Sequence, residues 1–263
     1  MLLEKKIVDI FKSRVLVRFD DTGTVYYYSA ADFEGLCSTP YTFIGNRGQK
    51  LVGSFYYYGA IKTDRIVIFE HGMGGGHLSY MKEIECLASH GYTVLAYDHT
   101  GCMQSEGENI GGFSQSLADL DCLIKSLKSD GNYKSTSFSV VGHSWGAFST
   151  LNISALHPQI THVVAISGFI SVRSILKQFF SGIMSLYVPA LIRIEQENNP
   201  KYANLDARKT LNTSRAHAMI IHSADDKTVS YKKNFLKLKK ALRNRDNALF
   251  ITLSGREIGR AHV

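Results

Sequence analysis

The sequence of 263 residues lacks the segments that would place a protein in a membrane or send it across one. No run approaches the ~20 consecutive apolar residues that a helix needs to span a bilayer. The first six residues, Met1 to Lys6, become charged too early to form the apolar core of a signal peptide. We therefore expect a cytoplasmic protein without stable membrane insertion.

Motifs for metal and nucleotide binding are also missing. The cysteines (Cys37, Cys86, Cys102 and Cys122) show neither metal-ligand spacing nor a Cys-x-x-Cys pair, so we expect reduced thiols. The histidines form no zinc pattern on one helix. A glycine run at 74–76 is not followed by the Lys-Ser or Lys-Thr of a phosphate-binding loop, and it does not fit Gly-x-Gly-x-x-Gly. We expect no cofactor and no metal.

The balance of charge gives a weak signal. The formal net charge is +7, and basic residues are concentrated between Lys232 and Arg245. Such a run is typical of the solvated face of a helix, and the net charge permits weak attraction to anionic surfaces. A nucleic-acid partner is not expected, because the chain has no recognisable binding module and no interleaved stacking aromatics. The composition does not indicate an oligomeric state.

Residues 1–60 read as an antiparallel preface to the main domain. Runs at 14–19 and 24–29 are rich in β-formers and are separated by Asp20-Asp21-Thr22-Gly23, which predicts a hairpin. Another β-rich run covers 51–58. The tyrosine triplets 26–28 and 56–58 are typical of a twisted edge sheet, with a sugar- or lipid-binding surface as the alternative.

From Arg65 onward, short apolar strands alternate with amphipathic helices. The expected strands are 66–69, 93–97, 137–141, 162–167, 218–222 and 248–253. This alternation predicts an α/β fold with a mostly parallel, doubly wound sheet over residues 61–257. Residues 169–215 interrupt the pattern with apolar helical stretches at 175–183 and 187–194. We interpret them as a small helical cap that shapes a substrate site, with ordinary connecting helices as the alternative.

The sequence Gly142-His143-Ser144-Trp145-Gly146 follows one of these strands and opens a helix. A serine at such a turn can act as a nucleophile if a base takes its proton, an acid orients the base, and donors stabilise the oxyanion. The backbone N–H groups of Trp145 and Met73 are candidate donors. The acid should follow the strand at 218–222, where Asp225 and Asp226 both qualify.

With His71-Gly72 after the first long strand and an Asp-Asp pair after a later one, the stretch 65–253 resembles the α/β-hydrolase superfamily. It is most similar to the serine aminopeptidase/monoglyceride-lipase-like group of esterases. The resemblance implies that Ser144 is the nucleophile. It also selects Asp226, because the family's strand commonly ends Gly-x-x-Asp and Ser223 stands here in the place of the glycine. The family's turn Asp-x-x-Gly-x-Gly-x-Ser covers 98–105, with Met103 replacing the second glycine.

The resemblance places the catalytic histidine in the loop after the last strand, before a closing helix. Here Leu253 is followed by only ten residues, and the tail 258–263 resembles a translated sequencing-library adapter. We therefore expect an artefactual tail at 258–263 and genuine sequence that ends near Glu257. On this interpretation the histidine is missing, and His262 is only a fallback for the third triad position.

These observations predict a serine hydrolase that cleaves carboxylic esters of small or hydrophobic acyl groups through an acyl-enzyme, with a small-molecule ester as its partner. The alternatives are an aminopeptidase or thioesterase of the same fold, or a ligand-binding protein without turnover. Apolar side chains of the expected cap favour a hydrophobic acyl or aromatic group: Ile175, Leu176, Phe179, Phe180, Ile183, Met184, Leu186 and Tyr187.

Overall fold

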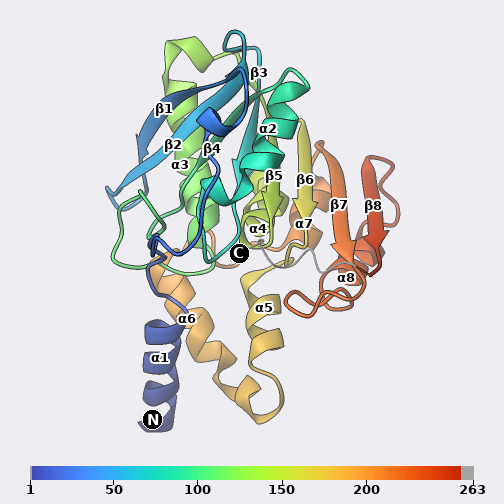
Figure 1. Cartoon of the computed structure of the whole chain (residues 1–263). Helices are drawn as coiled ribbons and strands as arrows, with labels where there is room; N and C mark the ends of the chain where they lie inside the picture. The colour runs from blue at the N-terminus through green and yellow to red at the C-terminus, as the bar shows by residue number, and fades with distance from the viewer. Residues whose placement is uncertain (1, 256–263) are drawn as a thin grey trace.

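An eight-stranded sheet runs through the molecule in the computed structural model, which describes residues 2–255 (Figure 1). The strand order is β1-β2-β4-β3-β5-β6-β7-β8. Strands β1 to β2 and β2 to β4 pair antiparallel, and all other neighbours pair parallel. The bounds are β1 Leu36–Ile44, β2 Lys50–Tyr58, β3 Arg65–Glu70, β4 Thr93–Tyr97, β5 Ser137–His143, β6 His162–Ile166, β7 His217–Ser223 and β8 Ala248–Leu253.

Helices cover both faces of the sheet (Figure 1). They are α1 Leu2–Arg14, α2 Met81–Ser89, α3 Gln115–Ser129, α4 Trp145–Asn152, α5 Val172–Phe179, α6 Val188–Asn198, α7 Ala207–Thr213 and α8 Phe235–Ala241. Short 3-10 helices are η1 Ala30–Asp32, η2 His77–Tyr80, η3 Gly131–Tyr133, η4 Ile153–Ala155 and η5 Gly182–Tyr187.

The central strands are apolar throughout because both of their faces are buried. In β3, Ile66 and Ile68 belong to the large core that α3 and α4 cover, whereas Val67 and Phe69 belong to a smaller core under α2. Alternate residues of a strand point to opposite faces, so the continuous apolar run serves two cores. The expected strands from residue 66 onward are all present.

The chain reverses its winding direction at β3, which lies between β4 and β5. The register pairs Glu70 with Gly142, so the loops that leave β3 and β5 start side by side. Such a switch point opens a crevice at the carboxyl ends of the strands, where ligands of α/β sheets bind. The sheet therefore brings the loop at 71–76 against the turn at Ser144.

The prediction for the N-terminal preface is partly wrong. Residues 2–14 form α1, and the runs 14–19 and 24–29 form no strands. The hairpin is instead made by β1 and β2, and only the run at 51–58 was expected as a strand. Residues 20–23, which predicted the hairpin turn, form only a local turn. In it the Asp21 carboxylate accepts a hydrogen bond from the Gly23 N–H at 2.8 Å.

The expected cap corresponds to α5, η5 and α6, which extend away from the carboxyl ends of the strands beside α1 (Figure 1). The rings of Phe11 on α1 and Phe180 after α5 lie 6.1 Å apart. On α6, buried Glu195 accepts hydrogen bonds from the N–H of Phe113 and of Ser114, at 2.6 Å and 3.1 Å. These contacts fix α1 and the cap to the loop before α3.

The apolar residues of the expected cap do not act as one set. Ile175 and Leu176 are buried in the large core, whereas Phe179, Ile183 and Leu186 are exposed to solvent. Whether these residues shape a substrate site stays a prediction.

The cysteines are free thiols, of which Cys102 is buried and Cys37 and Cys86 are exposed. In residues 2–255 no helix is both long and apolar enough to cross a bilayer.

Candidate active site

Ser144 lies on a tight turn between β5 and α4. Its backbone has φ 51° and ψ −106°, a conformation that L-residues rarely adopt and that stores strain. The turn needs Gly142 and Gly146, because a Cβ on Gly146 would overlap the carbonyl oxygen of Glu70 and one on Gly142 would meet the backbone of Gly146. The Ser144 N–H donates to the carbonyl oxygen of Ile166 at 2.8 Å, and the side chain is partly exposed at the N-terminus of α4. This is the geometry of a nucleophile elbow.

Two backbone N–H groups beside this serine are available to a ligand. Trp145 is the first residue of α4, where an N–H has no partner within the helix. Met73 lies in the loop after β3. In the part of the chain that the structure describes, neither N–H makes a hydrogen bond. The pair can therefore stabilise an oxyanion on an acyl group attacked by Ser144.

His71 holds the peptide group that carries the Met73 N–H. The Nε2 atom of His71 accepts a hydrogen bond from the His99 N–H at 2.9 Å, so its Nδ1–H donates to the Gly72 carbonyl oxygen at 2.7 Å. That carbonyl and the Met73 N–H belong to one planar peptide group. Burial, together with the neighbouring His99, lowers the pKa of His71 to about 3, so the ring stays neutral. His71 thereby sets the direction of the Met73 N–H.

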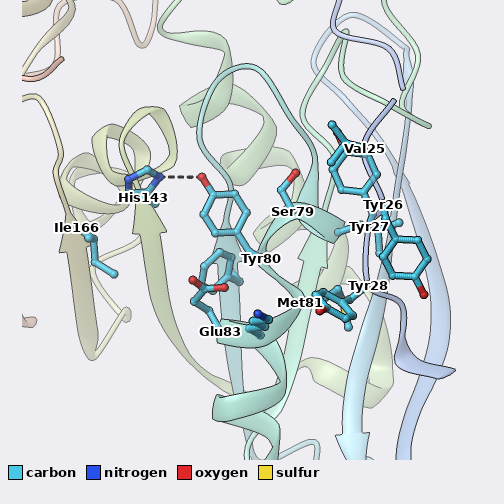
Figure 2. A pocket seen from close by; sticks show the side chains of 13 residues that line it. Val25, Tyr26, Tyr27, Tyr28, Ser79, Tyr80, Met81, Glu83, His143 and Ile166 are labelled. Carbon is cyan, nitrogen blue, oxygen red and sulfur yellow. Dashed lines mark hydrogen bonds between the residues drawn. The ribbon is translucent and has the colours of Figure 1, made fainter. Parts of the chain in front are cut away.

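Tyr80 fixes the other side of the same loop. Its hydroxyl accepts a hydrogen bond from the Gly72 N–H at 3.0 Å and lies 2.7 Å from Nδ1 of His143 (Figure 2). Both peptide groups that flank Gly72 are therefore held by side chains. A Cβ on Gly72 would lie 2.7 Å from the Tyr80 hydroxyl, so glycine is required for this close approach.

Asp226 lies in the loop after β7 and is buried. Its Oδ1 atom accepts hydrogen bonds from the N–H groups of Thr228 and Val229, at 2.8 Å and 2.9 Å. Burial opposes ionisation, but His222 and these two N–H groups outweigh it and lower the pKa of Asp226. Its Oδ2 atom is buried and makes no hydrogen bond with any described residue. One oxygen thus anchors the carboxylate, and the other is left for a further donor.

Asp225 and His222, the ionisable neighbours of Asp226, are placed differently. Asp225 is exposed and accepts a hydrogen bond from the Ser223 hydroxyl. The Nε2 atom of His222 lies 3.3 Å from Oδ2 of Asp226, but it hydrogen-bonds to the Val229 carbonyl oxygen at 2.8 Å. His222 is fully buried, as expected of a packed strand residue.

The histidine base is not found among the described residues. Nine of the ten histidines lie in residues 2–255, and none of these nine hydrogen-bonds to the Ser144 hydroxyl. The fallback His262 and the expected tail 258–263 lie outside the described residues. No cluster of three or more metal-ligating side chains is present in residues 2–255.

A buried polar cluster lies directly behind the elbow and consists of Glu70, Tyr97, His99 and Asp119. The His99 ring is 3.6 Å from a carboxylate oxygen of Glu70 and 3.6 Å from one of Asp119, and it packs 4.9 Å from the Trp145 ring. Burial raises the pKa of Glu70 to about 7, although His99 opposes this. Sequence reasoning did not identify this cluster. A glutamate at the end of the apolar run 66–69 was the available signal, because acidic side chains are rarely buried without a reason.

A cavity of about 360 Å³ opens on the α2 side of the sheet (Figure 2). It is lined by the segment 25–28, the residues around the start of α2, His143 and Ile166. The tyrosine triplet 26–28 thus borders this cavity rather than covering a sheet edge. Ser144, Met73 and Asp226 are not among the lining residues, so this cavity is not assigned as the substrate site.

The turn at 98–105 carries the departure from the family pattern. Met103, in the place of the second glycine, has φ 45°, which glycine adopts without strain. Arg18 holds the turn by donating to the carbonyl oxygens of Met103 and Ser105, at 2.6 Å and 2.8 Å. Met103 thus occupies a strained position in a turn that the Arg18 side chain holds.

Comparisons with known proteins agree with this geometry. A family model described as serine aminopeptidase, S33, matches residues 61–209. An esterase of Pyrococcus furiosus has the same fold with a TM-score of 0.69 and 21% identity, covering 90% of each chain. An esterase domain from Rhodothermus marinus gives 0.60 and 19% identity, covering 86% of this chain and 92% of that one.

A thioesterase domain from the curacin biosynthetic pathway gives a TM-score of 0.57 and 15% identity, covering 83% of this chain and 93% of that one. No curated protein sequence matches the chain. At these identities the likeness establishes the fold, which is the α/β-hydrolase fold with antiparallel N-terminal strands and a parallel remainder.

Proposed function

The chain belongs to the serine aminopeptidase S33 family, and from this membership and the strained turn at Ser144 we propose that it is a serine hydrolase acting on carboxylic esters. The observation that carries the proposal is the backbone of Ser144, with φ 51° and ψ −106° between a buried strand and a helix N-terminus. Strain of this kind persists where it serves a function, and in the proposed site it serves to present the hydroxyl beside the N–H groups of Trp145 and Met73.

In the proposed reaction, the Ser144 oxygen attacks the acyl carbonyl carbon while a histidine takes the hydroxyl proton. The N–H groups of Trp145 and Met73 stabilise the negative charge on the carbonyl oxygen. The histidine then gives its proton to the departing alcohol, which leaves an acyl group on Ser144. Water, deprotonated by the same histidine, releases the carboxylic acid. Asp226 orients the histidine and stabilises its cationic form.

The proposal places the base outside residues 2–255. Oδ2 of Asp226 is buried, makes no hydrogen bond with any described residue and belongs to an anchored carboxylate, which suits an acceptor for an imidazole N–H. His262 is the one histidine of this sequence outside the described residues. Either His262 supplies the base, or the chain as given lacks it.

Esters with small or hydrophobic acyl groups are the proposed substrates. The indole N–H of Trp145 donates to the Phe113 carbonyl oxygen at 2.7 Å, and the Phe113 ring lies within 6.5 Å of the Phe179 ring of the cap. Aromatic side chains therefore connect the residue after the nucleophile with the cap. The names of the Pyrococcus and Rhodothermus structures, both esterases, support the same class.

The test is covalent labelling by a fluorophosphonate, with the modified peptide identified by mass spectrometry. Four proteins are compared: the chain as given, Ser144→Ala, His262→Ala, and Asp226→Asn. Each is labelled with and without added imidazole, which can replace a missing histidine side chain. We expect labelling at Ser144 that is lost in Ser144→Ala and slowed at least tenfold in Asp226→Asn, because an unoriented base is a poor one.

The outcomes separate the possibilities. If His262→Ala abolishes labelling and imidazole restores it, His262 is the base. If His262→Ala changes nothing and imidazole accelerates labelling of the unaltered chain, the chain does not supply the base. Folded protein that is not labelled at Ser144 under either condition contradicts the hydrolase proposal and favours a binding protein. Hydrolysis of a peptide or a thioester in preference to a p-nitrophenyl ester refutes the substrate class alone.

A further inference from the structure

The end of the cap exposes apolar side chains that the fold does not use. Ile183 is 79% exposed, Leu186 is 73% exposed and Phe179 is 51% exposed. We call the segment 179–187 the cap tip. It lies at the end of the molecule furthest from the sheet (Figure 1). Single exposed apolar residues are common on protein surfaces, but a cluster marks an interaction site.

The local geometry gathers these side chains on one side. Residues 182–187 form the 3-10 helix η5, in which positions i and i+3 lie above one another. Ile183 and Leu186 therefore project in the same direction. The following helix α6 is different, because Val188, Leu191 and Ile192 are buried against the body of the protein. The cap thus has an inner apolar side that packs on the body and an outer apolar end exposed to water.

Helix α1 extends this end of the molecule. It contacts α6, its Phe11 ring lies 6.1 Å from the ring of Phe180 after α5, and its N-terminal end points to the same end of the molecule as η5 (Figure 1). Leu3 and Ile10 of α1 are exposed, whereas Ile7 and Phe11 are buried. The segment η5 and the helix α1 therefore both expose apolar side chains.

The charge around the cap tip is positive. Residues 131–194 contain no aspartate or glutamate, and the cap carries exposed Arg173, Lys177 and Arg193. Helix α1 contains four basic residues and two acidic ones. The tip therefore combines apolar side chains with nearby basic residues, and the cap contains no acidic residue up to residue 194. This combination complements a surface that has an apolar interior and an anionic boundary. A bilayer with anionic headgroups is such a surface.

We propose that the cap tip adsorbs to the surface of anionic lipid bilayers. Ile183 and Leu186 enter the boundary between headgroups and acyl chains, Phe179 and Leu3 lie at its edge, and the basic residues of α1 and α5 contact the headgroups. The association is peripheral, because η5 has six residues and would enter by about 5–10 Å. The cap end, and not the free sheet edges, would face the lipid.

The test is co-sedimentation of the purified chain with vesicles of phosphatidylcholine alone or with about one third phosphatidylglycerol. We expect binding to the anionic vesicles that weakens as sodium chloride rises from 50 to 500 mM, because salt screens the headgroup attraction. The double variant Ile183→Ser/Leu186→Ser should bind about tenfold less, since each side chain loses its transfer into the apolar layer. Arg173→Gln/Lys177→Gln should lose binding mainly at 50 mM salt.

Ile44→Ser is the matched control, because Ile44 is 61% exposed at the end of β1, away from the cap. It should bind as the unaltered chain does. If the tip variant and the control bind equally, the proposal is wrong. The proposal is also wrong if neither the unaltered chain nor the tip variant binds vesicles, and analytical ultracentrifugation shows a dimer of the unaltered chain that the tip variant does not form. In that case the cap tip is an interface between copies of the chain. Ser144→Ala should bind normally, so failure of the hydrolase proposal and failure of this one are distinguishable.

Discussion

Replacement of Glu70 by glutamine tests the buried polar cluster behind the elbow. Glutamine keeps the shape of the side chain but cannot ionise. Both carboxyl oxygens of Glu70 are buried and make no hydrogen bond with any described residue, so the change removes no such bond. What it removes is the cost of placing a negative charge in the core, which the 3.6 Å approach of His99 offsets only in part.

The size and sign of the effect follow from the raised pKa of Glu70. Its pKa is about 7 in the folded protein, against an ordinary value of 4.5. Between these values the folded state holds a proton that the unfolded state has released, so stability falls as pH rises through this window. At about 1.4 kcal/mol per pH unit, the loss is at most about 3 kcal/mol above pH 7. Coupled titration of Glu70 with His99 reduces this loss of stability, so we expect a loss of about 1–3 kcal/mol.

The assay is urea unfolding of both proteins at pH 5, 6, 7 and 8. The stability of Glu70→Gln relative to the unaltered chain should increase by about 1–3 kcal/mol across this range. Glu83→Gln, which alters an exposed carboxylate on α2, is the control and should give a difference that does not change with pH. A constant difference for Glu70→Gln as well would falsify the raised pKa. His71, whose own titration affects both proteins equally, cancels in the comparison.

Four further predictions concern the site and the packing around it. Met103→Gly should raise the free energy of unfolding by about 0.5–1 kcal/mol in urea, since it relieves the φ of 45°, and a lower stability would contradict this reasoning. His71→Phe should slow fluorophosphonate labelling of Ser144 about 10- to 100-fold, because the oxyanion donor loses its orientation, and an unchanged rate would show that the donor does not act. Asp121→Asn should cost about 2–4 kcal/mol in thermal unfolding, because buried Asp121 binds His157 at 2.7 Å and two lysines. Lys125→Met should cost less than about 0.5 kcal/mol, since the Lys125 side chain is 57% exposed and Asp121 keeps His157 and Lys201 as partners.

The parallel part of the sheet could be predicted because its signal is local. Each strand from 66 onward is a short apolar run bounded by polar loops, and the elbow and the acid loop follow such runs directly. Ser144 and Asp226 thus follow the ends of β5 and β7, as the sequence predicted. Their catalytic roles stay predictions.

The strand prediction for the N-terminal part of the chain was partly wrong for physical reasons. The runs 14–19 and 24–29 are rich in β-formers but find no neighbouring strand, so their propensity is overridden by tertiary contacts. Strand β1 was not predicted; it contains Pro40, which is tolerated because β1 lies at the edge of the sheet. Helix α1 was missed because its short apolar stripe becomes informative only when Phe11 meets the cap.

Apart from the His71-Gly72 motif, the supports of the site could not be predicted. The sequence shows Tyr80 and His99 as isolated polar residues far from Ser144. Only the register of β3 against β5, which pairs Glu70 with Gly142, brings them together behind the elbow. The hydrogen bond from His71 to the Gly72 carbonyl oxygen depends on a ring orientation that the His99 backbone sets.

Strand β8 has a consequence for how the protein behaves at high concentration. It is the last strand of the sheet, and within residues 2–255 no strand pairs with its outer side. The six residues Ala248–Leu253 are uncharged, and three of them, Phe250, Ile251 and Thr252, are strong β-formers. Natural edge strands usually carry a lysine, a proline or a bulge that prevents two molecules from joining their sheets. Without such a guard, β8 is the place where folded molecules would begin to pair edge to edge, so aggregation should start from native protein rather than from an unfolded form.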